Sequence, residues 1–387
     1  MNVSRREFQL FVKPAGAVCN LDCRYCYYLD KANLYGGAAT RMTESLLEQY
    51  VIQHFAAASG PSVDFSWHGG EPTTLGLDFF RKAVELQRKY APAGWRVRNG
   101  MQTNGVLLDD EWGRFLAAEG FHIGISLDGP AELHDPYRVN KGGQATHRQA
   151  LRGYEVLRRH GVSTDILCVI HSLNVRFPLD VYRFFRDIGC TYLGLLPVVE
   201  PDPRRPTGVS LYTPAAEDYG TFLCKMFDEW IARDTERIAV QTFEEAARPA
   251  LGMEHSLCVF RETCGQVPVL EHNGDFFPCD HYVDREHRLG NIQETPLAAL
   301  VDSPAQRAFG DAKRDTLPRY CRQCEVLAQC HGDCPKYRFL ATPDGRTVLM
   351  RLRDGVIVDV EPRKPAPRVF TFVQHDYPFE MPQIAEF

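Results

Sequence analysis

The chain has 387 residues, of which 44% are hydrophobic and 24% are charged, as is ordinary for a soluble globular protein. Its net charge of −6 gives no reason to expect nucleic acid or an anionic membrane as a partner. No apolar segment of the kind found in the core of a signal peptide follows residues 1–7, and no apolar run is long enough to span a membrane. We therefore expect neither a signal peptide nor a transmembrane helix. Its 13 cysteines fall into clusters, and in a cytoplasmic protein we expect them to bind metal rather than form disulfides.

From residue 6 to about 200, apolar strand-like runs alternate with amphipathic helical patterns. We predict strands at 7–13, 63–67, 95–102, 121–127, 163–170 and 191–197. We predict helices near 43–58, 77–90, 109–118, 144–160 and 176–188, and a further helix near 214–233. This alternation implies a parallel sheet with right-handed crossovers. About six such units suit an α/β fold of the incomplete (β/α) barrel type, with functional residues at the carboxyl ends of the strands.

Three cysteines stand close together directly after the first predicted strand. Cys19, Cys23 and Cys26 have the spacing C-x3-C-x2-C, and a short loop of this kind can turn three thiolates toward one centre. Three thiolates on a cubic iron–sulfur cluster leave one iron open for a small molecule to chelate. A structural zinc would need a fourth thiolate or imidazole, and only Asp22, Asp30 and tyrosines are near. We therefore favour a cluster over three buried structural cysteines.

This loop, with an aromatic residue directly before its third cysteine, resembles the signature of the radical S-adenosylmethionine (SAM) enzymes. The resemblance implies that Cys19, Cys23 and Cys26 hold a [4Fe–4S] cluster and that SAM chelates its fourth iron. In that family, cleavage of SAM yields a 5′-deoxyadenosyl radical that abstracts a hydrogen atom from the substrate. The family's usual partial (β/α)6 TIM-like barrel agrees with the strands and helices predicted above.

A pair of glycines ends the second predicted strand, in His68-Gly69-Gly70-Glu71-Pro72. Paired glycines let a backbone come close to a ligand, although a simple turn would use the same residues. The segment is similar to the family's GGEP motif, which contacts the amino group of SAM. The resemblance implies that Gly69, Gly70 and Glu71 bind the cofactor, and the alternative for Glu71 is a solvated loop acid.

Small polar residues end the third and fourth predicted strands, where ligands of parallel α/β folds bind. Segments 101–105 and 125–130 resemble the family's QTNG and SLDG segments, and they could equally be turns. The resemblance implies a SAM contact for Ser126 and a substrate contact for Gln102. Arg138 is a candidate for the SAM carboxylate or the substrate, and its alternative is a surface ion pair.

A second cysteine-rich region follows the proline- and charge-rich segment 201–206. Its seven clustered cysteines are Cys258, Cys264, Cys279, Cys321, Cys324, Cys330 and Cys334. Their unequal spacing fits two cubic clusters better than zinc, although the CxxC pair at 321 and 324 also suits a zinc knuckle. Residues 269–279 predict a β-hairpin with its turn at Asn273-Gly274.

This half resembles the SPASM extension of radical enzymes that modify peptides and proteins, and its spacing is most similar to the anaerobic sulfatase-maturating enzymes. Those enzymes oxidise a cysteine or serine of a nascent sulfatase to Cα-formylglycine. The resemblance implies that auxiliary cluster I is held by Cys258, Cys264, Cys279 and Cys334. It also implies that three corners of auxiliary cluster II are held by Cys321, Cys324 and Cys330.

The same resemblance assigns a role to Asp280, which directly follows Cys279. Removing a proton from the substrate radical makes its remaining electron easy to lose to a nearby cluster, so Asp280 is expected to be the base. The alternatives are a surface aspartate or a hydrogen-bond partner of cluster sulfur. Tyr28 matches an active-site tyrosine of the family, which implies a substrate contact, and aromatic packing is its alternative.

The C-terminal stretch departs from the family pattern, which has an eighth auxiliary cysteine soon after the position of Cys334. No cysteine follows Cys334 as far as Phe387. Either auxiliary cluster II takes another ligand, such as Asp354, His375 or solvent, or the reading frame changed near residue 346.

We therefore expect three parts: a radical SAM barrel over 1–235, a SPASM domain over 236–345 and a divergent tail over 346–387. The expected partners are an unfolded or nascent sulfatase polypeptide and an electron donor such as flavodoxin or ferredoxin, with no nucleic acid and no membrane. One alternative is another SPASM-type maturase that forms thioether or carbon–carbon crosslinks. Such enzymes often carry an added N-terminal peptide-binding domain, for which the position of Cys19 leaves no room. The other alternative is a non-catalytic multi-cluster or zinc-binding protein.

Overall fold

The computed structural model describes residues 3–36, 40–205 and 208–341 and, beyond them, three short strands. These are β12 (Thr347–Val348), which pairs with β11 (Leu340–Ala341), and β13 (Leu352–Arg353), which pairs with β14 (Val356–Ile357). The rest of the tail predicted at 346–387, including Asp354 and His375, lies outside the described residues. Within the described residues, no helix is both long and apolar enough to cross a membrane.

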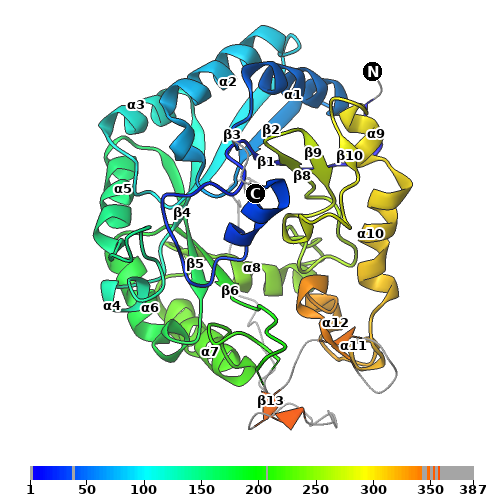
Figure 1. Cartoon of the computed structure of the whole chain (residues 1–387). Helices are drawn as coiled ribbons and strands as arrows, with labels where there is room; N and C mark the ends of the chain where they lie inside the picture. Colours follow the sequence, from blue (N-terminus) through cyan, green and yellow to red (C-terminus); the bar gives the residue numbers. More distant parts are fainter. Residues whose placement is uncertain are drawn as a thin grey trace.

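The six predicted strands are present and form the parallel wall of a barrel (Figure 1). They are β1 (Phe11–Lys13), β2 (Ser62–Trp67), β3 (Arg96–Thr103), β4 (Phe121–Ser126), β5 (Ser163–Ile170) and β6 (Tyr192–Pro197). Each pairs in parallel with the next, as the right-handed strand–helix–strand connection requires. Only the first strand is much shorter than predicted.

The predicted helices are also present, and Figure 1 shows them outside the arc of strands. They are α1 (Glu44–Ala57), α2 (Leu77–Tyr90), α3 (Asp110–Ala118), α5 (His147–Arg159), α6 (Pro178–Asp187) and α7 (Ala216–Arg233), with a short α4 (Ala131–His134). Helix α1 begins where predicted, since the Thr43 hydroxyl accepts a hydrogen bond from the Leu46 amide at 3.3 Å. The hydrophobic core fills the space between these helices and the strands, with Tyr50, Phe65, Trp67 and Phe80 among its largest fully buried members.

The cysteine-rich half extends the same sheet rather than forming a separate one. The predicted hairpin is confirmed as β8 (Val269–Glu271) and β9 (Asp275–Phe277), and β10 (Gly290–Asn291) follows it. Strand β8 pairs in parallel with β1, while β7 (Ala239–Val240) joins β6 at the other edge. The strand order is therefore β10-β9-β8-β1-β2-β3-β4-β5-β6-β7, which is a partial barrel with two open edges in the described residues.

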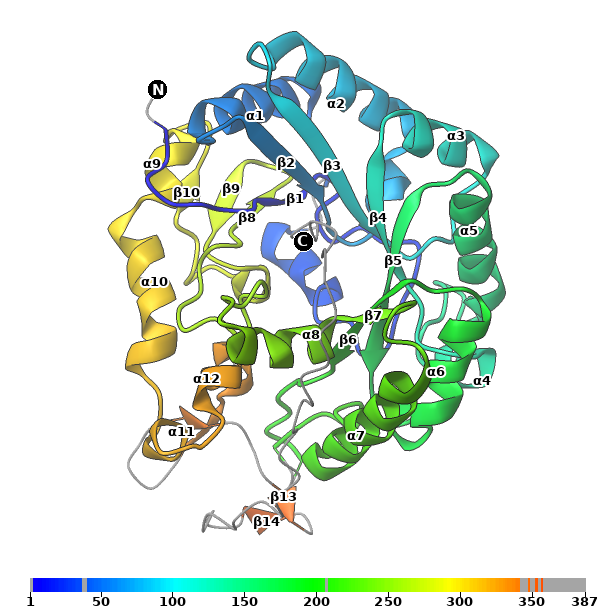
Figure 2. The same cartoon turned by 180° about the vertical axis from the view of Figure 1, so that it is seen from behind.

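Short helices complete the ring beside the open edges, as Figure 2 shows from behind. They are α8 (Gln241–Ala247), α9 (Leu297–Val301), α10 (Pro304–Asp315), α11 (Arg319–Arg322) and α12 (Leu327–Cys330). Single turns of 3-10 helix lie at η1 (Leu29–Tyr35), η2 (Pro72–Leu75), η3 (Asn174–Arg176), η4 (Arg248–Leu251), η5 (Asp280–Tyr282) and η6 (Pro335–Tyr337). The sequence did not predict these connections.

Candidate active site

The first cysteine loop leaves the carboxyl end of β1 and crosses the ends of the neighbouring strands. The Glu71 amide, after β2, donates to the Val18 carbonyl at 2.8 Å. The Asn104 side chain, after β3, donates to the side-chain oxygen of Asn20 at 2.8 Å. These contacts hold the loop at the end of the barrel where parallel strands bind their ligands.

The three cysteines of this loop act on one another electrostatically. Burial is the main reason that the pKa of the Cys19 thiol is raised to about 11 and that of Cys23 to about 12, and the charge of Cys26 contributes to both shifts. Such thiols stay protonated at neutral pH unless a metal takes the place of the proton. The structure thus gathers the three residues predicted to hold the SAM-binding cluster.

The glycine pair after β2 lies directly against this loop. A Cβ atom at Gly70 would lie 2.2 Å from the Val18 carbonyl oxygen, so only glycine fits there. Gly69 has φ +128°, which a residue with a Cβ atom rarely adopts. The close backbone approach that the glycines predicted is therefore made, in this structure, to the cysteine loop. Their contact with SAM stays a prediction.

Glu71 is 1% exposed, so the alternative of a solvated loop acid is wrong. Its carboxylate accepts hydrogen bonds from the amide and hydroxyl of Thr73 and the hydroxyl of Thr103, at 2.6–3.0 Å. It also accepts from the Asn104 amide at 2.7 Å. Glu71 therefore ties the ends of β2 and β3 together, and its predicted contact with SAM is untested.

Gln102 and Ser126 form one polar pair on adjacent strands. The Gln102 side-chain amide donates to the Ser126 hydroxyl at 3.0 Å. Gly124 stands opposite Gln102 in the strand register, and a Cβ atom there would lie 2.1 Å from the Gln102 side-chain oxygen. Glycine at this position therefore makes room for Gln102. The predicted contacts of the pair with SAM and substrate remain predictions.

Arg138 makes an ion pair, but it is a buried one, so the surface alternative is wrong. Its guanidinium binds both oxygens of the Asp128 carboxylate at 2.8 and 3.1 Å, and both side chains are at most 8% exposed. The Tyr25 hydroxyl donates to the same carboxylate, and the Arg138 guanidinium lies 5.5 Å from the centre of the Tyr25 ring. Arg138 and Asp128 thus anchor Tyr25, the residue directly before Cys26 in the loop. A contact between Arg138 and SAM stays a prediction.

Asp280 lies between the two cysteine-rich regions. It directly follows Cys279, and its carboxylate accepts a hydrogen bond from the hydroxyl of Tyr27, the residue after Cys26. The same carboxylate pairs with the ammonium of Lys13 at the end of β1. The Asp280 side chain is 19% exposed and that of Lys13 is 3% exposed. The Asp280 side chain is therefore only partly buried, although its Oδ1 atom is shielded from water together with the cation.

The charge state of Asp280 suits a proton acceptor. Burial raises its pKa, but the Lys13 ammonium, His281 and the hydrogen bond from Tyr27 together hold the pKa well below its usual range. Asp280 is therefore ionised at neutral pH, and each carboxylate oxygen has lone pairs beyond those that Lys13 and Tyr27 use. An exposed surface aspartate does not describe this residue.

Tyr28 is engaged on both its polar and its aromatic side. Its hydroxyl donates to the Glu271 carboxylate, and the Lys13 ammonium lies 3.9 Å from the centre of its ring. The residue is 3% exposed. Tyr28 therefore positions Lys13 and, through it, Asp280, while its predicted substrate contact is untested.

The auxiliary thiols fall into two further groups, and within each group the thiols raise one another's pKa. The charge of Cys258 raises the pKa of Cys264, Cys279 and Cys334, and burial raises the pKa of Cys264 to about 11 and of Cys334 to about 12. In the same way Cys324 raises the pKa of Cys321 and Cys330. These groups have the same members as the two sets implied by the resemblance, and their role as cluster ligands stays a prediction.

The donor sets fit iron–sulfur clusters by their chemistry. Each group offers three or four free thiols. In a cubic cluster each thiolate binds a different iron, so the thiols need not meet at one point. No three cysteine, histidine or carboxylate side chains of the described part converge as ligands of a single metal ion.

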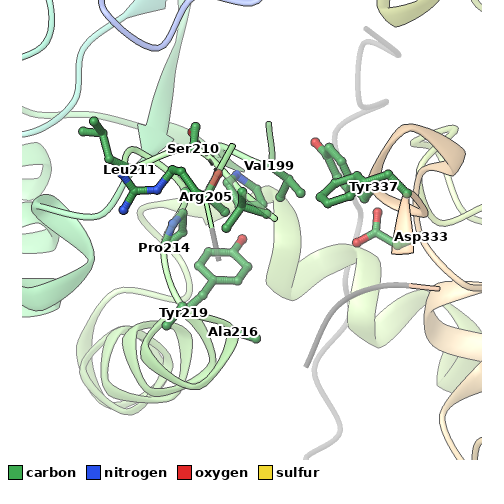
Figure 3. Close-up of a pocket in the computed structure, with 14 residues that line it drawn as sticks. Val199, Arg205, Ser210, Leu211, Pro214, Ala216, Tyr219, Asp333 and Tyr337 are labelled. Carbon is green, nitrogen blue, oxygen red and sulfur yellow. Dashed lines mark hydrogen bonds between the residues drawn. The ribbon is translucent and has the colours of Figure 1, made fainter. Parts of the chain in front are cut away.

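A cavity of about 290 Å³ opens between the barrel and the cysteine-rich half (Figure 3). Apolar residues between 197 and 219 line one side, and Asp333, Tyr337 and Phe339 line the other. Figure 3 shows Asp333 and Tyr337 facing Val199 and Tyr219 across this space. The cavity therefore has a largely apolar wall, the guanidinium of Arg205 and the carboxylate of Asp333.

This cavity is linked to Asp280 by a pair of charged residues. Glu200, next to the lining residue Val199, pairs with the ammonium of Lys336. That ammonium lies 4.7 Å from the centre of the ring of Tyr27, which in turn holds Asp280. Glu200, Lys336 and Tyr27 thus connect the wall of the cavity to Asp280.

Sequence comparison matches this geometry to known families. Residues 14–185 match the radical SAM superfamily, and residues 261–325 match the SPASM iron–sulfur cluster-binding domain. The chain is therefore an enzyme, a radical SAM oxidoreductase with a SPASM domain, and this class works with SAM and [4Fe–4S] clusters.

More specific relatives narrow the class. The chain is 39% identical to the serine-type anaerobic sulfatase-maturating enzyme of Bacteroides thetaiotaomicron, over 90% of this chain and 88% of that protein. It is 30% identical to the cysteine-type enzyme of Clostridium novyi, over 88% and 91% of the two chains. The solved structure of native anSMEcpe with bound AdoMet and Cp18Cys peptide superposes with a TM-score of 0.78 at 31% identity, covering 88% of this chain and 92% of that one. The chain belongs to the anaerobic sulfatase-maturating enzymes.

The sequence analysis missed four residues of this site, Lys13, Tyr27, Glu200 and Lys336. Lys13 ends a strand that is otherwise apolar, and a charged residue at the carboxyl end of a barrel strand is a signal that could have found it. Tyr27 lies among Tyr25, Cys26 and Tyr28, and nothing in the sequence distinguishes it from the other tyrosines. Glu200 and Lys336 are far apart in the sequence, and no pattern connects them.

Proposed function

We propose that this enzyme oxidises a serine or cysteine side chain of an unfolded sulfatase polypeptide to Cα-formylglycine, with Asp280 as the base. The observation that carries the proposal is the position of Asp280. It is hydrogen-bonded to the residue after Cys26 and directly follows Cys279, so it stands between the two cysteine groups.

The cofactors supply the two hard steps when bound: a 5′-deoxyadenosyl radical that takes a hydrogen atom from the substrate Cβ, and a cluster that accepts the remaining electron. Oxidation of a CH2OH group to CHO removes one hydrogen atom, one proton and one electron. The same three losses convert the CH2SH group of cysteine to a thioaldehyde, which water hydrolyses to the aldehyde with release of hydrogen sulfide. Asp280 takes the proton from the hydroxyl or thiol, and Lys13 keeps the carboxylate ionised until then. Tyr27 fixes the direction of the carboxylate.

The ligand sets follow the cysteine groups. Cys19, Cys23 and Cys26 hold the SAM-binding cluster, Cys258, Cys264, Cys279 and Cys334 hold auxiliary cluster I, and Cys321, Cys324 and Cys330 hold three corners of auxiliary cluster II. The proposal also divides the chain into a barrel over 1–235, which carries the first ligand set, and a SPASM domain over 236–345, which carries the other two. An electron donor such as flavodoxin or ferredoxin and a cytoplasmic location belong to the same proposal.

The cavity of Figure 3 receives part of the substrate polypeptide beside the residue that is oxidised. Its apolar wall suits the side chains of an unfolded chain, and the Glu200–Lys336 pair leads from it to Tyr27.

The test is an anaerobic assay with reconstituted protein, reductant, SAM and peptides that carry Cys-x-Pro-x-Arg or Ser-x-Ala-x-Arg. Formylglycine formation lowers the mass by about 18 Da from cysteine or about 2 Da from serine, as the chemistry of the cofactor requires. Unchanged peptide masses together with rapid formation of 5′-deoxyadenosine would contradict the proposed substrate.

The role of the cavity is tested separately with Ala216→Phe, which fills the space from the start of α7. We expect the KM for the peptide to rise about tenfold, which corresponds to about 1.4 kcal/mol of lost binding. Lys225→Phe, at an exposed position of the same helix, is the matched control. An equal KM in both variants would remove the cavity from the proposal.

A further inference from the structure

Helix α10 (Pro304–Asp315) turns one face toward the loops that carry the auxiliary cysteines. Gln306, Gly310 and Lys313 lie on this face. Gly310 accepts a hydrogen bond from the Cys264 amide at 3.2 Å, and a Cβ atom there would lie 2.3 Å from the Cys264 carbonyl oxygen. The helix is therefore packed as closely as glycine allows against a cluster-binding loop.

Lys313 is a cation without a carboxylate partner at the centre of this face. Its side chain is fully buried, and its ammonium donates to the carbonyls of Cys258 and Val259 at 2.8 and 2.7 Å. It makes no ion pair within 4 Å with the described carboxylates. Burying an ammonium among neutral groups costs several kcal/mol, so a negative charge must lie nearby.

Hydrogen bonding alone does not require a cation here. Gln306, two turns earlier on the same face and also fully buried, donates its neutral amide to the carbonyls of Gly265 and Pro278 at 2.8 and 3.2 Å. The same helix thus holds two pairs of loop carbonyls, one pair with an amide and one with an ammonium. The positive charge at 313 needs a separate explanation.

A second buried cation lies between the two auxiliary cysteine groups. Arg338 is 5% exposed and donates to the carbonyls of His331, Gly332, Asp333 and Lys313 at 2.7–3.1 Å. All three residues of the turn 331–333 have positive φ, between 44° and 73°, and this turn joins Cys330 to Cys334. Arg338 therefore clamps a strained turn that connects a ligand of one proposed cluster to a ligand of the other.

The carboxylate of Asp333 forms no ion pair with either cation. It accepts a hydrogen bond from the Cys334 amide at 2.6 Å, and Arg338 donates to the backbone carbonyl of the same residue. By contrast, thiolate-bound iron–sulfur clusters carry a net negative charge, and Lys313 and Arg338 both lie among the cluster cysteines.

We propose that Lys313 and Arg338 are the counter-cations of the auxiliary clusters, Lys313 beside the cluster of Cys258, Cys264, Cys279 and Cys334, and Arg338 between that cluster and the one of Cys321, Cys324 and Cys330. The proposal rests on the ligand sets of the proposed function. A cation beside a cluster favours its reduced form, because reduction adds a negative charge. These residues would therefore set how readily the auxiliary clusters accept the electron of the substrate.

The test uses the full chain with Cys19, Cys23 and Cys26 changed to alanine, so that only auxiliary clusters form. Lys313→Gln keeps hydrogen-bond donors for the two carbonyls, as Gln306 does, and removes the charge. Lys313→Arg keeps the charge, and Arg314→Met changes an exposed neighbour on the same helix. The readout is a reductive titration followed by electron paramagnetic resonance, together with iron and sulfide content.

We expect Lys313→Gln to disfavour reduction of one auxiliary cluster about tenfold, which is a shift of about 59 mV toward lower potential for one electron. Lys313→Arg and Arg314→Met should stay close to the parent. If Lys313→Gln loses the cluster while Lys313→Arg retains it, the charge is again what matters. Equal potentials in the Gln and Arg variants, or equal loss of the cluster from both, would overturn the proposal.

This experiment does not depend on formylglycine formation. A parent protein with full auxiliary clusters and a normal response to Lys313→Gln, but without activity on sulfatase peptides, would refute the proposed substrate alone. A parent protein that binds zinc, or no metal, at these cysteines would refute the ligand sets and the counter-cations together.

Discussion

The barrel and the cysteine-rich half neutralise their buried charges in different ways. At the carboxyl end of the barrel, Arg138 pairs with Asp128 and Lys13 pairs with Asp280. In the cysteine-rich half, Lys313 and Arg338 donate only to backbone carbonyls. The polypeptide alone thus balances the charges of the barrel site, whereas the auxiliary region is balanced only when its clusters are bound.

This difference has a consequence for assembly. The Arg138–Asp128 pair lies wholly within the barrel and can form before any iron arrives, whereas the aspartate that pairs with Lys13 comes from the cysteine-rich half. The auxiliary region gains its missing negative charge together with the metal, so metal binding and folding are coupled there.

The largest expected effect comes from breaking a barrel pair. Arg138→Met leaves Asp128 buried without its cation, which typically costs about 3–5 kcal/mol of folding free energy. Denaturant unfolding under anaerobic conditions measures this cost, and we expect it to be similar with and without bound iron. Adding Asp128→Asn should restore part of the lost stability. A loss of stability confined to the iron-loaded protein would contradict the idea that the chain alone balances the charges of the barrel site.

A smaller effect, which depends on iron, is expected at Lys313. In the iron-loaded protein, Lys313→Met should lower the free energy of unfolding by about 1–3 kcal/mol, the usual range for a hydrogen-bonded charged group. After the iron is removed with a chelator, the same substitution should be neutral or stabilising, because it removes a buried cation without a partner. Unfolding curves of both forms decide the question, and destabilisation of equal size in both would count against the account.

The smallest effect concerns the pH dependence of the base. Lys13→Met removes the cation that does most to depress the pKa of Asp280, so burial is opposed less and the pKa rises. Protonated Asp280 cannot accept a proton, and the rate of formylglycine formation should fall about tenfold for each pH unit below the new pKa. Wild-type protein should show no such acid limb, because its Asp280 stays ionised. Rates between pH 5 and 8, with SAM cleavage as the internal control, measure the difference.

The stability of the wild-type protein should also decrease as the pH falls, for the same reason. A depressed pKa means that the Lys13–Asp280 pair contributes stability above the unfolded-state pKa of aspartate, and the contribution is lost as the pH falls toward the folded-state pKa. Lys225→Met, at an exposed position, should leave both profiles unchanged.

Much of this architecture was predictable from the sequence because its signals are local. The spacing of apolar residues and the lengths of the runs placed the six strands and their helices within a few residues. The cysteine spacing predicted the first thiol group, and the division of the later seven cysteines into two sets followed from the family resemblance. The turn at Asn273-Gly274 gave the β8–β9 hairpin. The pairing of β8 with β1 was not predictable, since it joins segments more than two hundred residues apart and no pattern in either one names its partner.

The site residues divide along the same line. Asp280 could be found because it follows a cluster cysteine, whereas its partner Lys13 lies at the far end of the sequence. Lys313 carried an unused signal, since Gln306, Gly310, Lys313 and Leu317 recur at helical spacing and all four are buried. A lysine on the buried face of a helix indicates a hidden anion, which in this chain is the cluster that we propose.

The most direct test of the central claim, that Asp280 is the base between the clusters, is an Asp280→Asn variant with a substrate peptide deuterated at Cβ. Hydrogen abstraction and proton removal are then read separately, as deuterium in 5′-deoxyadenosine and as formylglycine in the peptide. If Asp280 is the base, deuterium still reaches 5′-deoxyadenosine, while formylglycine formation falls by about 10²–10⁴-fold, the usual contribution of a general base. Formylglycine formation at the wild-type rate would contradict this role.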